Sequence, residues 1–407
     1  MRDNSVDAFF ALVRAGLWGK PGADLNVDLN LNENADWKKV YRLSQEQAVQ
    51  GLVLQGIERL KRQNDRLDIP QVLLLQWIGE VQMIGQQNKD MNAFVAELFG
   101  KIHNHDINAL LVKGQGLAQC YEKPLWRSSG DVDLLLSNDD YPKAKEFLMP
   151  LGVLTEPEDT AKKHFAINIE GWTIELHGTL HCGLSRSIDK ILDEVQTDTF
   201  MGKMSDGSDK NVRVWKNGET YIPLLSADND VLYVFTHILQ HFYKGGIGIR
   251  QICDWCRLLW TYKDSLDQGE LESRIRKAKL MTEWMAFGTF AVEYLGMPIE
   301  AMPLLSDNIN ALPALQALST AEKKSNMAKN LRKKSDKICE FILEVGNFGQ
   351  NRDNSYFQTH SYFVQKCISA WRRVKDLYRH AAIFPINSVR FFFGIMYNGI
   401  ASAIRGE

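Results

Sequence analysis

Residues 110–136, LLVKGQGLAQCYEKPLWRSSGDVDLLL, decide the expected fold because two apolar runs flank a glycine-containing turn. The first run, residues 110–112, predicts a buried strand. The glycines within residues 113–116 break that strand and allow backbone N–H groups to come close to a ligand. A helix expected over residues 117–121 would place these amides at a helix N-terminus, where an anion binds favourably. The segment therefore predicts a strand, a turn suited to phosphate, a helix and a second strand.

The second strand, residues 131–136 (DVDLLL), carries two acidic side chains on one face. Side chains alternate along a strand, so Asp131 and Asp133 project together while Val132 and Leu134 face the core. Two carboxylates a few ångströms apart raise each other's pKa unless a cation lies between them. Mg²⁺ binds carboxylates and leaves coordination positions for water and phosphate oxygens. The simplest interpretation is a divalent metal site at the start of this strand.

Gly114 followed by the Asp-x-Asp of residues 131–133 resembles the polymerase-β-type nucleotidyltransferase superfamily. The longer pattern, KG-x-x-L with Tyr121, Pro124, Arg127 and DVDLLL, is similar to the uncharacterised bacterial nucleotidyltransferases within it. Gln115 departs from this pattern, because Gly or Ser commonly follows the first glycine. The resemblance implies an α+β fold, in which a small mixed β-sheet nucleotidyltransferase core is flanked by N-terminal and C-terminal helical regions.

A third acidic candidate lies in a predicted β-hairpin. Residues 164–169 and 172–177 alternate between apolar and polar positions, and Glu170-Gly171 between them predicts a tight turn. Glu175 and His177 then share a strand face. The resemblance implies that Glu175 completes the metal site, on a strand beside the Asp-x-Asp strand; alternatively, Glu175 faces solvent on an edge strand. His177 is either a hydrogen-bonded structural histidine or a contact to nucleotide or substrate.

The resemblance further implies which residues hold the nucleotide. Asp131, Asp133 and Glu175 would be the catalytic residues and the ligands of two Mg²⁺ ions, which activate an acceptor hydroxyl and neutralise the departing pyrophosphate. The substrate would be a nucleoside triphosphate, with ATP expected. The residues expected to bind its phosphates are Lys113, Gly114, Gly116, Arg127 and Ser129.

Composition indicates an ordinary globular protein. The 407 residues are 45% hydrophobic and 24% charged, and the net charge of −2 provides no bulk attraction to nucleic acid or anionic lipid. Any site for a polyanion must therefore be a local patch. The N-terminal sequence lacks a signal-peptide pattern, and no apolar stretch reaches the roughly 18 residues that a membrane span needs. A cytoplasmic location without a transmembrane span is expected.

Three regions are predicted along the chain. Residues 1–106 form an N-terminal helical region, residues 107–225 the nucleotidyltransferase-like catalytic core, and residues 226–407 a C-terminal helical region. In the first region, helices are expected over 5–15 and from 71 towards 102, with helical spacing over 36–62. Polar loops are expected over 21–35 and 203–210, and a helix over 228–242.

Cysteine and histidine pairs in the C-terminal region allow two interpretations each. Cys253-x-x-Cys256 lies within a helical pattern and indicates either core packing or half of a zinc site. His237 and His241, at i and i+4, either pack or bind metal, although Ile238 excludes an HExxH motif.

Basic residues in the same region are also ambiguous. Arg250 either reaches a nucleotide phosphate or pairs with Asp254 one turn later. The seven Lys and Arg residues within 323–337 indicate a solvated helix face or a nucleic-acid patch. A basic segment before the aromatic residues 391–393 is compatible with contact to a membrane surface, but burial against the protein body is favoured.

We therefore expect a metal-dependent nucleotidyltransferase that moves a nucleoside monophosphate to a hydroxyl acceptor, on a protein or a small molecule, and releases pyrophosphate. Transfer to RNA ends is an alternative that only the basic run supports. A regulatory or interaction module that binds nucleotide without turnover, and a hydrolase that uses water as acceptor, also remain open.

Overall fold

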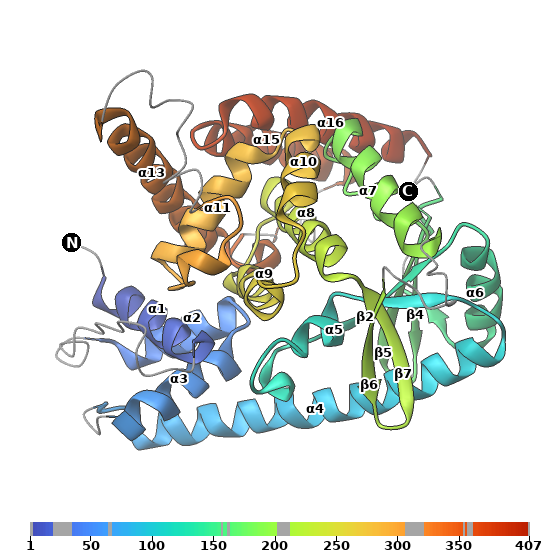
Figure 1. The fold of residues 1–407 in the computed structure, drawn as a ribbon, viewed down its shortest axis with the longest axis horizontal. Helices are drawn as coiled ribbons and strands as arrows, with labels where there is room; N and C mark the ends of the chain where they lie inside the picture. The colour runs from blue at the N-terminus through green and yellow to red at the C-terminus, as the bar shows by residue number, and fades with distance from the viewer. Residues whose placement is uncertain are drawn as a thin grey trace.

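The computed structural model in Figure 1 describes residues 3–18, 35–63, 67–155, 158–160, 163–201, 212–305, 321–352, 355 and 361–405. Apart from Ala35, the polar loops predicted over 21–35 and 203–210 lie outside these ranges. The α-helices are α1 (Asn4–Leu17), α2 (Trp37–Glu46), α3 (Gln50–Gln63), α4 (Gln71–Asn104), α5 (Gly114–Ala118), α6 (Asp140–Leu148), α7 (Arg186–Met201), α8 (Ala227–Lys244), α9 (Ile249–Tyr262), α10 (Gln268–Ala278), α11 (Met281–Glu293), α13 (Ala321–Val345), α15 (Tyr362–Ala381) and α16 (Pro385–Arg405). Short 3₁₀ turns are η2 (Pro124–Trp126), η3 (Met149–Leu151), η4 (Ile299–Ala301) and η5 (Asn347–Gly349). The strands are β1 (Ala109–Val112), β2 (Asp131–Leu136), β3 (Val153–Leu154), β4 (His164–Ile169), β5 (Trp172–His177), β6 (Val212–Asn217) and β7 (Thr220–Leu225).

The strands form one seven-stranded mixed sheet in the order β3-β4-β5-β2-β1-β7-β6. β2 runs parallel to β5, and β1 runs parallel to β7, whereas the other neighbouring strands are antiparallel. Helices from both ends of the chain surround this sheet in Figure 1. The arrangement confirms the predicted α+β fold, a mixed sheet flanked by N-terminal and C-terminal helical regions.

The strands predicted around the acidic residues match the structure. β2, β4 and β5 have the predicted limits, and Glu170 and Gly171 adopt the positive φ angles, 54° and 89°, that a tight hairpin turn requires. The helix predicted over residues 117–121 is wrong in position, since α5 begins directly at Gly114. The reason is that Leu117 N–H donates to the carbonyl oxygen of Lys113, which starts the first helical turn earlier.

The two faces of the sheet contact different partners. Val132, Leu134, Ile174 and Leu176 belong to an apolar cluster completed by side chains of α4 and α6. Leu135, which points the opposite way, joins a larger core that contains side chains of α7, α8 and α9. The face that carries Asp133 and Glu175 is therefore turned towards the C-terminal helices.

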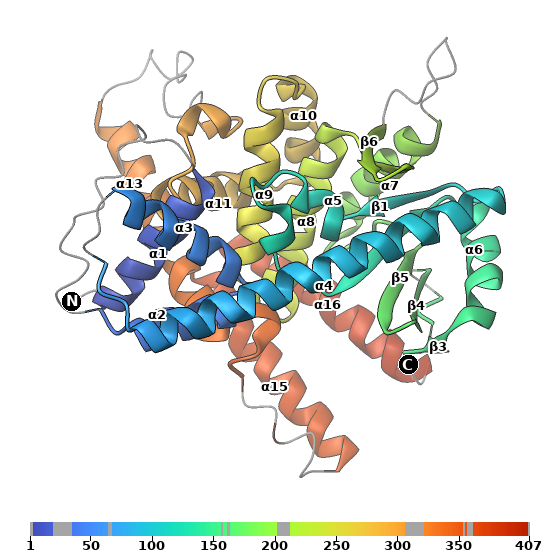
Figure 2. The same cartoon turned by 90° about the horizontal axis from the view of Figure 1, so that it is seen from below.

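The helix α4 connects the two cores. It is 34 residues long and runs from the N-terminal helices along the sheet, which is clearest in Figure 2. Trp77 and Val81 near its start lie in the larger core, whereas Met91 and Ile102 lie in the cluster beneath the sheet. This single helix thus fixes the sheet relative to the N-terminal region.

The helical spacing predicted over residues 36–62 corresponds to two helices, α2 and α3. Ala48 between them adopts a φ angle of 54°, which a continuous helix does not allow. The backbones of α1 and α3 then approach so closely that a Cβ on Gly56 would lie 2.1 Å from the carbonyl oxygen of Leu12. Glycine is required at this crossing because it has no Cβ.

The N-terminal and C-terminal helices share one core. The Trp18 indole N–H donates to the carbonyl oxygen of Leu295 over 2.6 Å, and the rings of Phe10 and Phe290 are 6.4 Å apart. The N-terminal and C-terminal helices therefore pack against each other. The region boundaries placed at residues 106 and 225 from the sequence remain a prediction.

Two of the ambiguous sequence features of the C-terminal region are wholly or partly buried. Cys253 and Cys256 are fully buried free thiols within the larger core, in agreement with core packing. Phe391 is buried as well, whereas Phe393 is 68% exposed. Among the described residues, no helix has the length and apolar character needed to cross a membrane.

Candidate active site

Three carboxylates from two adjacent strands meet on the sheet face that is turned towards the C-terminal helices. Asp133 is paired in register with Glu175 on the parallel neighbour β5, and Asp131 precedes it by two residues on the same face. One carboxylate oxygen of each of the three side chains lies within 4.8 Å of the others. Asp133 is buried, Glu175 is half-buried and Asp131 is exposed, so the group opens to solvent at one end.

Lys113 provides the positive charge nearest to these carboxylates. Its ammonium lies 2.5 Å from Asp133 Oδ1, in a position with little exposure. The lysine backbone has a φ of 57° and a ψ of −142°, a conformation that residues other than glycine rarely adopt and that costs about 1–3 kcal/mol. The strained junction between β1 and α5 thus directs a cation onto the acidic group.

Two histidines complete the cluster. His177 Nε2 donates to Asp133 Oδ1 over 2.7 Å and lies 3.5 Å from Glu175 Oε2. His164 Nε2 lies 3.3 Å from the same Glu175 oxygen. His177, for which the sequence allowed two roles, thus contacts two of the three predicted metal ligands, and Glu175 does not simply face solvent.

The electrostatics of the group are uneven. The neighbouring charge of Asp133 raises the pKa of Asp131 to about 6, with a smaller contribution from partial desolvation of the carboxyl group within the cluster. Burial alone would also raise the pKa of Asp133, but Lys113 and the hydrogen bond from His177 outweigh it and hold that pKa below its usual range. The two aspartates therefore differ strongly in the ease with which they bind a proton.

The hydrogen bond between His164 and Glu175 acts on both partners. It lowers the pKa of the Glu175 carboxyl and raises the pKa of the His164 imidazole. Burial lowers the pKa of His177, which favours its neutral form.

A cavity of about 350 Å³ opens beside the acidic group. Its near wall includes Lys113, Asp131 and Glu175, and its far wall comes from α8 and η5. On α8, His237 and His241 are hydrogen-bonded to each other through their Nε2 atoms over 3.0 Å. Among the described side chains that could together hold a metal ion, neither of these two histidines appears.

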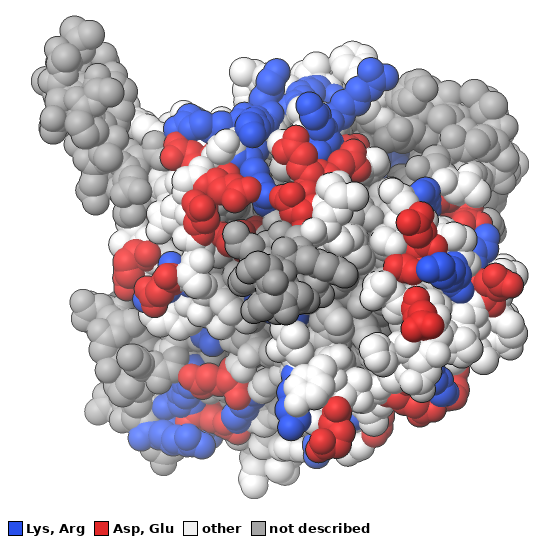
Figure 3. Space-filling model, turned by 45° about the vertical axis from the view of Figure 1, so that its right-hand side comes forward, with Lys and Arg blue, Asp and Glu red and all other residues white. Residues whose placement is uncertain are grey.

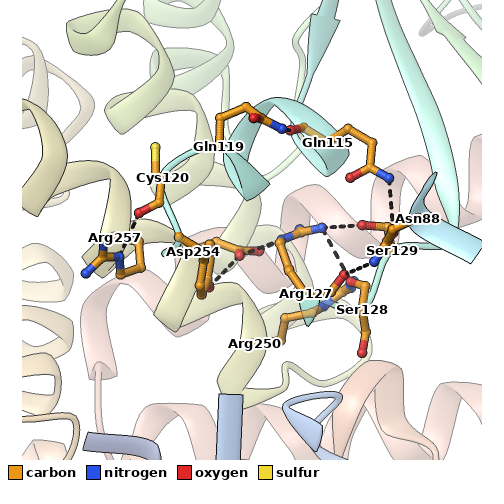
Figure 4. Close-up of polar contacts among 11 residues, drawn as sticks. Asn88, Gln115, Gln119, Cys120, Arg127, Ser128, Ser129, Arg250, Asp254 and Arg257 are labelled. Atoms are coloured by element: carbon orange, nitrogen blue, oxygen red, sulfur yellow. Dashed lines mark hydrogen bonds and ion pairs between the residues drawn. The ribbon is translucent and has the colours of Figure 1, made fainter. Parts of the chain in front are cut away.

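Arg127 and Ser129 belong to a separate buried network, drawn in Figure 4. The Arg127 Nε and Nη2 groups donate to the two oxygens of Asp254, each over 2.8 Å, and Nη1 donates to Ser129 Oγ over 2.8 Å. Arg250 donates to the carbonyl oxygen of Ser128 over 2.6 Å. Asp254 is thus the partner of Arg127 rather than of Arg250, which corrects the pairing considered from the sequence. The predicted phosphate contacts of Arg127 and Ser129 stay predictions.

Packing and backbone conformation explain the residues of the turn between β1 and α5. A Cβ on Gly116 would lie 2.9 Å from a methyl group of Leu224 on β7, so this glycine allows α5 to pack closely on the sheet. Gly114 has a φ of 38° and continues the tight turn after Lys113. The buried Gln115 amide donates to Asn88 on α4, which in turn donates to the carbonyl oxygen of Arg127. Gln115, the departure from the resemblance, therefore ties the turn to the segment before β2.

The acidic group has the chemistry of a divalent-cation site. Carboxylate oxygens are the ligands of Mg²⁺, and two such ligands of one ion lie roughly 3–4 Å apart at bond lengths near 2.1 Å. The separations within 4.8 Å require only small side-chain rotations to reach that geometry. With one ammonium against three carboxylates among the described side chains, the group also lacks positive charge, which a divalent cation would supply.

Sequence reasoning overlooked His164 and the Arg127–Asp254 pair. His164 could have been found, because the predicted hairpin turn sets the strand register and places it opposite His177. The partner of Arg127 lies 127 residues away in the chain, so no local pattern indicates it.

Comparison with known proteins supplies one match. Residues 33–296 match a family described as an uncharacterised nucleotidyltransferase, a span that includes all three carboxylates, both histidines and Asp254. No curated protein and no solved structure matches the chain.

Proposed function

This chain belongs to the family of uncharacterised nucleotidyltransferases, and on that premise we propose that it moves a nucleoside monophosphate from a nucleoside triphosphate to a hydroxyl acceptor. The acceptor oxygen would form a bond to the α-phosphorus, the bond from that phosphorus to the bridging oxygen would break, and pyrophosphate would leave. The acceptor hydroxyl gives up its proton in the same reaction. ATP is the nucleotide that we expect.

The observation that supports this proposal most directly is the meeting of Asp131, Asp133 and Glu175 at the edge of a cavity. These three side chains would hold the Mg²⁺ ions that the resemblance implies. When bound, such ions activate a hydroxyl for attack and neutralise the charge that develops on pyrophosphate. We assign the three carboxylates as the catalytic residues on this basis.

Lys113 and the turn after it are assigned to the triphosphate. The ammonium at the cavity wall offers a positive charge to phosphate oxygens. The backbone N–H of Gly114 lies at the start of α5, where helical N–H groups lack partners within the helix. Gly116 is assigned to the same turn, and its packing against Leu224 keeps the turn close to the sheet.

Arg127 acts as a positioning residue in this proposal. All of its guanidinium nitrogens are used in contacts to Asp254, Ser129 and the Ser128 carbonyl oxygen. These contacts fix residues 127–129 directly before β2, and thereby the place of Asp131. Ser129 Oγ accepts a hydrogen bond from Arg127, and its own hydroxyl hydrogen can still be donated to a phosphate oxygen.

The RNA-end alternative loses part of its support. Of the basic residues in 323–337, Lys334 and Lys337 donate to the carbonyl oxygens of Ile383 and Ala382, and Arg332 pairs with Glu293. The side chains of Lys323 and Lys324 lie outside the described ones. On the face drawn in Figure 3, acidic and basic side chains are interspersed below a basic upper edge. We therefore favour a protein or small-molecule acceptor.

The proposal is tested with a nucleoside triphosphate labelled at the α-phosphate. The labelled nucleotide and Mg²⁺ are incubated with the purified protein in a cell lysate, and label attached to any macromolecule or metabolite is measured. The wild type should transfer label, whereas Asp131→Ala/Asp133→Ala should not. Asp193→Asn is the matched control, because this exposed carboxylate pairs with His181 outside the acidic group.

Three results would contradict the proposal. Equal transfer by the wild type and the double variant would exclude a role for the aspartates. Binding of Mg²⁺-ATP by calorimetry without attachment of label to any acceptor would favour a module that binds nucleotide without turnover, and release of free nucleoside monophosphate would favour a hydrolase.

A further inference from the structure

Two imidazoles and a carboxylate form a second donor group beside the three carboxylates. One atom each of His164, Glu175 and His177 lies within 4.8 Å of the others. The Nε2 atoms of His164 and His177 are 3.3 and 3.5 Å from Glu175 Oε2, respectively. Two ligands of a tetrahedral ion, each bound at about 2.1 Å, are separated by roughly 3.4 Å, so these distances already suit one shared cation.

The strand register brings this group together. His164 and His177 are directly opposite each other on β4 and β5, with ring centroids 5.0 Å apart. Glu175 lies two residues from His177 on the same face and is opposite Ala166. All three donors line the cavity of about 350 Å³, so a further coordination position would be open to a ligand.

We propose that His164, Glu175 and His177 form a second metal site that takes a borderline divalent ion, of the class of Zn²⁺ or Co²⁺, and shares Glu175 with the group of three carboxylates. The proposal deepens the proposed function, since it rests on the same acidic group, but it concerns which ion is bound and by which atoms.

Ligand chemistry separates the two halves of this cluster. Mg²⁺ prefers oxygen ligands and keeps much of its water, whereas imidazole nitrogens suit zinc and other transition metals. Asp131 and Asp133 offer only oxygen, and His164 and His177 offer only nitrogen to an ion. Glu175, with its two oxygens, belongs to both donor groups and is placed to bridge them.

Charge also favours a cation at the histidine side. Glu175 is the one acidic member of this trio, and the ammonium of Lys113 is directed at Asp133 instead. Asp133 accepts from both Lys113 and His177, so the Glu175 carboxylate is left with one hydrogen bond among the described residues, from the His164 imidazole. A divalent ion between the two imidazoles and Glu175 would replace these contacts by stronger ones.

The experiment uses Co²⁺ as a probe on the full-length, metal-stripped protein. Calorimetry measures the Kd for Co²⁺ and for Mg²⁺, and X-ray absorption of the Co²⁺-loaded protein counts imidazole ligands. We expect tighter binding of Co²⁺ than of Mg²⁺, with two imidazoles in the wild type and one in His164→Gln. His164→Gln should weaken Co²⁺ binding by roughly tenfold to a hundredfold and leave the Kd for Mg²⁺ nearly unchanged.

His181→Gln is the matched control, because His181 lines the same cavity but pairs with Asp193. It should keep the wild-type affinity for Co²⁺. Equal thermal unfolding of the two variants in EDTA establishes that both are folded. Unchanged Co²⁺ affinity and two imidazoles in His164→Gln, or no imidazole in the wild type, would overturn the second site.

The outcome is separable from that of the proposed function. Asp131→Asn should abolish transfer of labelled nucleotide but keep the imidazole signal of bound Co²⁺. A protein that shows this signal yet never transfers label would retain the metal site and refute the transferase. A protein that transfers label with Mg²⁺ but shows no imidazole ligation would support the transferase and refute the second metal site.

Discussion

Two clusters of charged side chains lie close together around the segment before β2, and they are balanced differently. In the first cluster, one guanidinium, Arg127, meets one carboxylate, Asp254, through two hydrogen bonds, and both side chains are buried. In the second, three carboxylates face one ammonium among the described side chains, that of Lys113. Residues 127–131 connect the two clusters along the chain. Of the two clusters, only the second contributes side chains to the lining of the 350 Å³ cavity.

This difference in charge balance distinguishes a structural cluster from one suited to bind a ligand. A buried ion pair with matched charge satisfies its own hydrogen bonds and fixes the chain. A cluster with excess negative charge is destabilised by repulsion between its carboxylates, and a bound cation would relieve that repulsion. Such a charge imbalance is expected of a metal site. Charged side chains therefore fix residues 127–129 in the first cluster, whereas in the second cluster they are available to bind a cation.

The largest expected effect is on activity, in the unbalanced cluster. Asp131→Asn should lower nucleotide transfer on the order of a thousandfold, because it removes a carboxylate from the proposed metal site. The free energy of unfolding of the metal-free protein should not decrease, since the substitution removes a repulsive charge. Transfer of α-labelled nucleotide and urea unfolding measure the two quantities. A large loss of stability would show that Asp131 is structural instead.

In the balanced cluster, the expected effect is on stability. Asp254→Ala should lower the free energy of unfolding by about 3–5 kcal/mol, because Arg127 is left buried without its partner. The double variant Arg127→Met/Asp254→Leu should recover most of that loss, apart from the hydrogen bond that the Tyr121 hydroxyl donates to Asp254. Urea unfolding of the two proteins tests this, and an equal loss in both would contradict the view of a self-contained pair.

The clusters should also differ in their response to pH. The pKa of Asp131 is raised from 3.8 to about 6, so between these values the folded protein holds a proton that the unfolded chain releases. Asp131 should therefore contribute a negative slope to the free energy of unfolding between about pH 4 and 6, opposed by the positive slope of His237 and His241, whose pKa values burial lowers. Urea unfolding in EDTA at several pH values should show a more positive slope for Asp131→Asn than for the wild type. Identical slopes would exclude the raised pKa.

The smallest expected effect isolates the backbone at Lys113. Lys113→Gly and Lys113→Ala both remove the ammonium, but the positive φ of this residue suits glycine. The glycine variant should be more stable than the alanine variant by about 1 kcal/mol, which reverses the usual order. Thermal unfolding of the pair measures the difference. A more stable alanine variant would show that the backbone relaxes once the lysine side chain is absent.

Much of the sheet could be predicted because its strands are short apolar or alternating segments bounded by turn residues. Residues 131–136, 164–169 and 172–177 form strands with the predicted limits, and Asp131, Asp133 and Glu175 lie together as the resemblance implied. Residues 117–121 were less predictable, since the helix begins at Gly114, a residue with low helix propensity that usually marks a break. The catalytic and phosphate-binding roles assigned to these residues remain predictions.

The sequence by itself determined which side chains share a strand face, because side-chain alternation is a local property of the chain. It thereby determined two pairs, Asp131 with Asp133 and Glu175 with His177, whereas the tertiary structure placed the two strands side by side. Only the tertiary structure decided that Arg127 binds Asp254 and that Lys113 meets Asp133. It likewise decided that α8 closes the cavity opposite the carboxylates. These contacts depend on how distant segments pack, and packing of an apolar core fixes the position of polar groups that no local pattern encodes.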